Sequence, residues 1–138
     1  PDTTDILAIH DYAYDSSEFG EKYRRENYDT LYPQRRKLMA ESCIYEGQPA
    51  LLTEFGGIAM QREAKDGNWG YNTGAKSEEE FLSRYKNLMD GIYAQKELQG
   101  FCYTQLTDVQ QEVNGLLYPD RSPKFEMSKI KKITEHKD

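Results

Sequence analysis

Three short apolar segments recur along the chain, at Asp5–Ile9, Pro49–Thr53 and Phe101–Leu106. Each is largely apolar and lacks a strict alternation of apolar and polar residues. Such runs are typical of strands that are buried on both faces, as in a parallel sheet. We therefore expect three buried strands that pair in parallel.

The strongest helical pattern follows the second apolar segment. Ser77-Glu78-Glu79-Glu80 has the form of a capping box, in which a serine at the N-cap and a glutamate three residues later bind the first backbone N–H groups. Apolar residues then recur at three- and four-residue spacing as far as Tyr93. We expect the helix to end near Leu98, with Gly100 as its C-cap.

Weaker patterns predict the remaining elements. An apolar stripe over Gln34–Tyr45, followed by Gly47, predicts a second helix, and another over Phe125–Ile133 predicts a last helix. The charged tail Thr134–Asp138 is expected to fray. The stretch from Tyr14 to Tyr32 has no clean period and predicts a long loop with at most a short helical turn.

The alternation of strands and helices predicts an α/β fold with a parallel sheet. A chain of 138 residues is long enough for one domain or part of one. Polar or glycine-rich residues follow each predicted strand. In α/β proteins the binding and catalytic residues gather at the C-terminal ends of the strands, so we expect the functional site there.

Glu54 is the sharpest candidate for a functional side chain. It lies in Thr53-Glu54-Phe55-Gly56-Gly57, where the two glycines allow a ligand or another backbone segment to approach closely. The alternative is a carboxylate that only caps the following turn. His10 and Tyr12 hold the equivalent position after the first strand, where they either join this site or satisfy nearby backbone groups.

Other polar and aromatic residues are weaker candidates. Trp69 and Tyr71 lie in the loop after Glu54, where aromatic faces can stack on sugars or bases, or simply pack the loop. Asp108 and Glu112 are four residues apart and would share one face of a helix if that segment is helical. A solvated helix face is favoured over a metal site, because no histidine or third acid stands nearby.

Charge and composition exclude several classes of partner. The chain has 24 acidic and 18 basic residues, a net charge of −6, which disfavours nucleic acid and anionic membrane surfaces. No apolar run approaches the ~18 residues of a membrane span. No nucleotide-binding motif occurs, and no cofactor or metal is expected. Cys43 and Cys102 form no metal pattern and are expected to be small buried hydrophobes.

Several of these segments together resemble the catalytic domain of glycoside hydrolase family 2, which includes β-galactosidases, β-glucuronidases and β-mannosidases. The resemblance is carried by Thr53–Gly57, by the string Tyr103–Leu116 and by Arg121-Ser122-Pro123-Lys124. It extends from Asp5 to about Ile133 and is strongest to β-galactosidase-like proteins.

The resemblance implies a fold and a mechanism. The family domain is a (β/α)8 TIM barrel of about 250 residues, so residues 1–138 would be its C-terminal part, with the last three strands. The family hydrolyses β-glycosides with retention, using two glutamates. Glu54 matches the nucleophile. The acid/base is the glutamate of an Asn-Glu pair that this sequence lacks, so the chain alone is expected to be inactive.

The resemblance also implies roles for other residues. Tyr12 matches a tyrosine that hydrogen-bonds to the nucleophile and would orient Glu54. His10 stands where some relatives carry an asparagine that faces the sugar, and Thr104 lies near the position of a tryptophan that walls the sugar site in some relatives. Further candidates for lining the sugar site are Trp69, Tyr71, Gln105 and Asp108.

Two other hypotheses remain open at this point. The chain can be a non-catalytic carbohydrate-binding or scaffold piece with the same fold, or a self-standing open α/β domain with an unrelated ligand. As part of a barrel, its partners would be a carbohydrate substrate and the missing N-terminal part of the barrel. Three strand–helix units would leave two strand edges unpaired, which predicts self-association.

Overall fold

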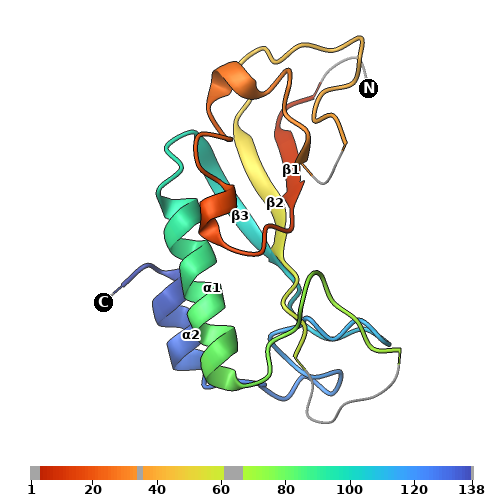
Figure 1. The fold of residues 1–138 in the computed structure, drawn as a ribbon, viewed down its shortest axis with the longest axis vertical. Helices are drawn as coiled ribbons and strands as arrows, with labels where there is room; N and C mark the ends of the chain where they lie inside the picture. The colour runs from red at the N-terminus through yellow and green to blue at the C-terminus, as the bar shows by residue number, and fades with distance from the viewer. Residues whose placement is uncertain (1–3, 34–35, 61–66, 138) are drawn as a thin grey trace.

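The computed structural model describes residues 4–33, 36–60 and 67–137 of the chain. Its centre is a parallel sheet with the strand order β1-β2-β3 (Figure 1). The strands are β1 (Leu7–Asp11), β2 (Ala50–Gly56) and β3 (Leu98–Thr104). The predicted α/β class with parallel strands is therefore confirmed.

The helices and a long loop cover the core face of this sheet. Helices α1 (Glu78–Tyr93) and α2 (Met127–Thr134) pack against each other beside the sheet (Figure 1). The loop after β1 contains two short 3₁₀ turns, η1 (Ser16–Glu18) and η2 (Arg25–Asn27), where the sequence predicted a long loop with a single short helical turn. The core joins aromatic and aliphatic side chains from all these elements, among them Ile9, Phe19, Tyr28, Leu52, Phe81, Tyr85 and Leu88.

The strands are buried on one face, not on both as the sequence predicted. In β1, Leu7, Ile9 and Asp11 are buried, whereas Ala8 and His10 between them are exposed. Cys102 of β3 is exposed too, so the expectation that it is buried is wrong, and Cys43 is half-buried. These residues are exposed because the helices and the loop pack only against the face of the sheet that carries Leu7 and Ile9. β1 and β3 are the two edge strands, and self-association through them stays a prediction.

Helix α1 begins at the predicted capping box, but the second of the two capping hydrogen bonds is shifted by one residue. The Ser77 hydroxyl accepts a hydrogen bond from the Glu80 N–H at 3.1 Å. The Glu80 carboxylate accepts from the N–H of Lys76, at 2.9 Å, and not from that of Ser77. The helix ends at Tyr93, earlier than predicted, because Leu98 and Gly100 pair with Ala50 and Leu51 of β2 and belong to β3.

The helix predicted over Gln34–Tyr45 is wrong for residues 36–45; residues 34 and 35 lie outside the described part of the chain. Leu38 donates its N–H back to the Leu31 carbonyl, and Tyr45 donates to the Asp29 carboxylate, so these backbone groups are not in a helical ladder. Met39 is nevertheless buried. A short helix is only marginally stable by itself, and here the apolar side chains pack without one.

The described part of the C-terminal tail contacts α1 and α2, and whether the tail frays stays a prediction. The His136 ring stacks on Tyr93 with centroids 4.5 Å apart, and its Nε2 lies 3.3 Å from an Asp90 oxygen. Backbone N–H groups of Glu135, His136 and Lys137 all donate to carbonyls of α2. Asp138 lies outside the described residues.

Among the described residues, no helix has both the length and the apolar character that a bilayer crossing requires.

The N-cap of α1 gives a test of this fold. Replacing Ser77 with alanine removes the acceptor for the Glu80 N–H, and we expect the free energy of unfolding to fall by about 1 kcal/mol. Urea denaturation followed by circular dichroism measures this change. Ser83→Ala, at an exposed position inside α1, is the matched control, because it makes the same substitution away from the cap. Equal stabilities of the two variants would contradict the capping role.

Candidate functional site

An irregularity in β2 places Glu54 on the open face of the sheet. Ile9 pairs with Leu52, but the next residue of β1, His10, pairs with Glu54, so Thr53 is an extra residue in the ladder. The alternation of burial breaks at the same point, since Thr53 and Glu54 are both half-buried and Phe55 is fully buried. Such a bulge re-aims the side chains that follow it. Here it turns Glu54 out of the core and Phe55 into it.

The carboxylate of Glu54 contacts one side chain near the end of β1 and one directly after it. The Tyr12 hydroxyl donates a hydrogen bond of 2.6 Å to Glu54 Oε2, and His10 Nδ1 lies 3.2 Å from the same oxygen. The contact between Tyr12 and Glu54 that the sequence predicted is therefore present. The Glu54 side chain keeps 39% of its surface exposed, so a ligand can reach it.

Two aromatic residues of the loop after β2 continue this site. The ring of Tyr71 stacks face to face on Tyr12, with centroids 3.4 Å apart and an interplanar angle of 4°. The ring of Trp69 meets Tyr71 edge-on at 5.8 Å and is 47% exposed. The structure therefore brings Trp69, Tyr71, Tyr12 and Glu54 together.

Gly57 allows the close approach of Tyr71. Its φ is +58°, in the left-handed region, and its carbonyl accepts the Tyr71 N–H at 2.8 Å. A Cβ at this position would lie 2.4 Å from the Tyr71 ring. A side chain here would therefore push Tyr71 away from Tyr12, which is a physical reason for the second glycine after Glu54.

The electrostatics of the site keep Tyr12 protonated. Burial, followed by the hydrogen bond to Glu54, raises the pKa of the Tyr12 phenol well above its ordinary value of 10.0. The carboxylate disfavours a second negative charge beside it. Tyr12 is consequently a permanent hydrogen-bond donor at neutral pH. A half-exposed carboxylate held by a phenol is suited to act as a nucleophile or a base.

The loop after β3 supplies the next predicted residues. Gln105 is half-buried, and its side-chain amide donates to Asn114 Oδ1 at 2.8 Å. The Thr104–Gln105 peptide bond, at the junction of strand and loop, is cis.

Asp108 is placed differently from the prediction. Its side chain is 5% exposed and forms a 2.7 Å ion pair with Lys124, and it also accepts the Gly115 N–H at 2.8 Å. Asp108 therefore supports the loop instead of lining an open surface. The segment with Glu112 is not helical either, because Val109 and Glu112 pair across a tight turn. The expectation of a solvated helix face is thus wrong for Asp108.

No group of three or more histidine, cysteine or acidic side chains that could hold a metal occurs within residues 4–33, 36–60 and 67–137.

The sequence did not single out Asn114 and Lys124, which are both buried at this end of the sheet. Neither residue belongs to a helical or strand periodicity from which burial can be predicted, because Asn114 lies in a loop and Lys124 precedes the last helix. Their role follows only from their contacts, which link the loops after β2 and β3.

Comparison with known proteins gives matches among solved structures only. No protein-family model and no curated protein matches the chain. A GH2 β-galacturonidase from Eisenbergiella tayi, with galacturonate bound, superposes over 97% of this chain at a TM-score of 0.59 and 15% identity. A β-glucuronidase from Faecalibacterium prausnitzii covers 96% at 0.55 and 18%, and one from Bacteroides uniformis covers 88% at 0.51 and 18%.

The chain has a GH2-like fold. It spans only 24%, 22% and 14% of the lengths of these three enzymes. At such low identities the likeness shows the fold, in agreement with the family resemblance found in the sequence. The activity that it suggests is taken up below.

The buried phenols predict how stability depends on pH. Burial raises the pKa values of Tyr12, Tyr23 and Tyr103 well above 10.0. Above pH 10 the unfolded chain therefore loses protons that the folded chain keeps. The buried phenols should therefore contribute their full stabilisation below pH 10. We expect the free energy of unfolding to fall as the pH rises above 10.

Denaturation with urea between pH 8 and 11.5 measures this decline. Tyr12→Phe should make the decline shallower, because one protected phenol is removed. Tyr32→Phe, at a position that is 60% exposed, is the control and should leave the slope as it is. Stability that stays level up to pH 11.5 would contradict the pKa argument.

Proposed function

We propose that this chain is the C-terminal part of the (β/α)8 catalytic barrel of a retaining β-glycosidase and that Glu54 is the nucleophile of that enzyme. The observation that carries the proposal is the 2.6 Å hydrogen bond from the Tyr12 hydroxyl to Glu54, at the adjacent C-terminal ends of two parallel strands. In barrels of this kind the catalytic residues come from the C-terminal ends of different strands. The GH2-like fold supports the same assignment.

The proposed reaction has two steps at Glu54. A carboxylate oxygen of Glu54 attacks the anomeric carbon, and the bond to the leaving oxygen breaks as a general acid outside this chain protonates that oxygen. Water then attacks the anomeric carbon of the glycosyl-enzyme and gives a proton to the conjugate base of that general acid, which releases the sugar and restores the carboxylate of Glu54. Inversion at each step gives overall retention. Tyr12 holds the attacking carboxylate in place throughout, because it remains a donor.

The exposed surroundings of Glu54 are suited to a sugar ring. Trp69 presents an aromatic face next to Tyr71, and such faces stack on the apolar side of a sugar. His10 lies beside the carboxylate, on the same open face of the sheet, where its imidazole can reach a sugar hydroxyl. We propose His10, Trp69, Tyr71 and Gln105 as residues that line the substrate site of the parent enzyme.

The proposed substrates are β-glycosides, with a β-galactoside favoured by the sequence resemblance. The structural neighbours act on β-galacturonides and β-glucuronides by name. The set of test substrates is therefore aryl β-galactoside, β-mannoside, β-glucuronide and β-galacturonide. Hydrolysis of one of them by the parent protein identifies the sugar.

Replacement of Glu54 tests the assignment of the nucleophile. In the parent protein, Glu54→Gln keeps the size of the side chain but removes the attacking oxygen anion. We expect hydrolysis of the best aryl glycoside to fall by about four orders of magnitude or more. Glu46→Gln, on the exposed turn before β2, is the matched control and should retain activity. Full activity of the Glu54 variant would refute the proposal.

The chain by itself should show no measurable glycosidase activity. General acid catalysis contributes roughly 10²–10⁴-fold, and we expect its residue to lie upstream. Contacts that grip the sugar from the other strands of a barrel would also be missing, and positioning supplies a still larger factor. Assays of the four aryl glycosides on the chain and on the parent protein make the comparison. Turnover by the chain alone would show that the site is already complete.

A further inference from the structure

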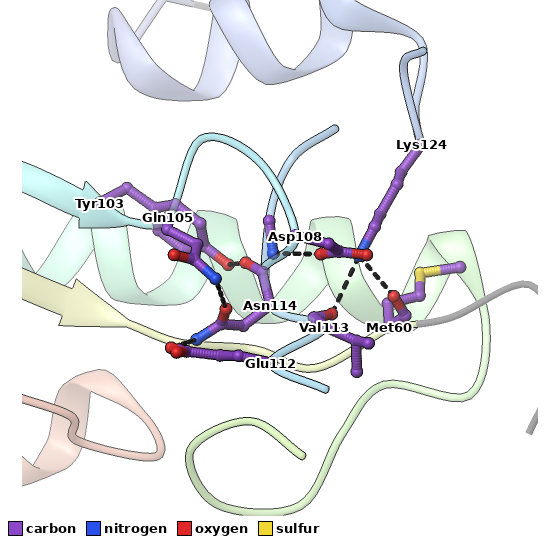
Figure 2. A network of polar contacts seen from close by, with 9 residues as sticks. Met60, Tyr103, Gln105, Asp108, Glu112, Val113, Asn114 and Lys124 are labelled. Carbon is purple, nitrogen blue, oxygen red and sulfur yellow. Dashed lines mark hydrogen bonds and ion pairs between the residues drawn. The ribbon is translucent and has the colours of Figure 1, made fainter. Parts of the chain in front are cut away.

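Lys124 is a fully buried cation at the end of the sheet where Glu54 lies. Its side chain has 0% of its surface exposed. Figure 2 shows its ammonium group between three oxygens: Asp108 Oδ1 at 2.7 Å, the Met60 carbonyl at 2.5 Å and the Val113 carbonyl at 2.9 Å. An ammonium has three N–H donors, so all of them are used.

The three acceptors belong to two different loops. Met60 follows β2, whereas Asp108 and Val113 follow β3. The same Asp108 oxygen that faces Lys124 accepts the N–H of Gly115, and a Cβ on Gly115 would lie 2.4 Å from the Asp108 backbone nitrogen. One side chain from the segment before α2 thus ties both loops together.

Lys124 binds the same loop segment that forms backbone hydrogen bonds with Trp69. The Val113 N–H donates to the Trp69 carbonyl at 2.8 Å, and the Trp69 N–H donates to the Gln111 carbonyl at 2.7 Å. The Val113 carbonyl, which Lys124 binds, also accepts the Met60 N–H at 2.9 Å. A displacement of Val113 would therefore displace Trp69.

Asn114 extends the support to Gln105. It is 0% exposed, accepts from the Gln105 amide and donates to Glu112 Oε1 at 3.0 Å (Figure 2). Its carbonyl accepts the Tyr103 hydroxyl at 3.2 Å. Val113 therefore holds the backbone of Trp69, and Asn114 holds the side chain of Gln105, two residues that we propose to line the site.

We propose that Lys124 is a positioning residue that fixes the place of Trp69 relative to Glu54 and thereby sets how tightly the sugar ring is bound. The contacts from Trp69 through Tyr71 and Tyr12 to Glu54 transmit this placement. The consequence for sugar binding rests on the proposed function, whereas the placement of Trp69 does not.

A charge is needed at this position because of what it binds. Without the ammonium, the carbonyls of Met60 and Val113 would each lose a hydrogen bond and the Asp108 carboxylate would be buried without its cation. Burial lowers the pKa of Lys124, and the contact with Asp108 opposes that shift. An apolar residue of similar length fills the space but binds none of these groups.

Trp69 is the sole tryptophan of the chain, so its fluorescence reports its own environment. The test compares quenching by acrylamide in the chain and in Lys124→Met, with circular dichroism to select conditions in which both are folded. Trp69 is 47% exposed in the original chain, so full exposure would about double its contact with solvent. We therefore expect the quenching constant to rise about twofold in Lys124→Met. Lys132→Met, on the exposed surface of α2, should not change it. Unchanged quenching in folded Lys124→Met would overturn the proposal.

A double variant separates placement from stability and serves if the single variant does not fold. Lys124→Met with Asp108→Asn leaves no uncompensated charge, and the asparagine oxygen can still accept the Gly115 N–H. We expect its stability to exceed that of Lys124→Met while quenching of Trp69 stays about twofold above the value of the original chain. Quenching that returns to the original value would show that the contacts of Lys124 with Met60 and Val113 are not needed, and would overturn the proposal.

Kinetics of the parent protein provide the second readout. If Trp69 stacks on the sugar equally in the ground state and the transition state, its displacement raises KM and leaves kcat nearly unchanged. We expect KM to rise about five- to tenfold in the double variant, with kcat changed less than twofold. A purely structural role would lower kcat through loss of folded enzyme at constant KM, and that result would overturn the proposal. A parent protein without glycosidase activity would refute the proposed function, and the quenching result would still decide the placement of Trp69.

Discussion

The parallel pairing of β1 and β2, with its one-residue bulge at Thr53, is the constraint on which the rest of the site depends. Parallel pairing brings the C-terminal ends of the two strands to one edge, so that His10 and Tyr12 lie beside Glu54. Without the bulge, the period of two along a strand would leave Glu54 on the side of Leu52, in the core. The extra residue sends the carboxylate to the open face and gives its place in the core to Phe55. A single local irregularity thus places the Glu54 carboxylate on the open face while Phe55 packs in the core.

Around this carboxylate, a series of aromatic rings connects the end of β1 with the loop after β2. Tyr12 touches Glu54 with its hydroxyl and Tyr71 with its ring, so one residue provides both the polar and the apolar side of the site. The series depends on Gly57, where only a hydrogen fits against Tyr71. These contacts are short and directional, and they hold the carboxylate in one orientation. Such a fixed orientation would favour the nucleophilic attack that we propose for Glu54.

The open end of the sheet has its own support, which is polar and buried. Loops on a protein surface usually satisfy their backbone groups with water, but two carbonyls of the loops after β2 and β3 accept instead from the ammonium group of Lys124. The Asn114 side chain links the side chains of Gln105 and Glu112 in the same region. The arrangement explains why a charged residue is retained at full burial beside an otherwise aromatic core. It also joins the loop that carries Trp69 to the loop that carries Gln105.

The sequence by itself determined the elements whose signals are local. The apolar runs located the three strands, and the Ser77 capping box located the start of α1. The positions of Glu54, Tyr12 and His10 near the strand ends made them candidates for one site, and the family resemblance implied the contact between Tyr12 and Glu54. Their contacts follow from the strand order, which the structure supplies, and from parallel pairing, which the alternation of elements predicts. The apolar stripe over residues 34–45 misled, because apolar spacing reports that side chains are buried and does not report where the backbone hydrogen bonds go.

Only the tertiary structure decided the features that depend on residues far apart in the chain. The bulge at Thr53 exists relative to both neighbouring strands, so no pattern within β2 alone defines it. Asp108 looked like a solvent-facing acid until Lys124 was found against it, and Cys102 looked buried because its apolar neighbours did not show which face of β3 is covered. In each case the environment of a side chain is set by a segment that pairs or packs with it from elsewhere in the sequence. Such environments are properties of the folded chain, because they arise only when those segments meet.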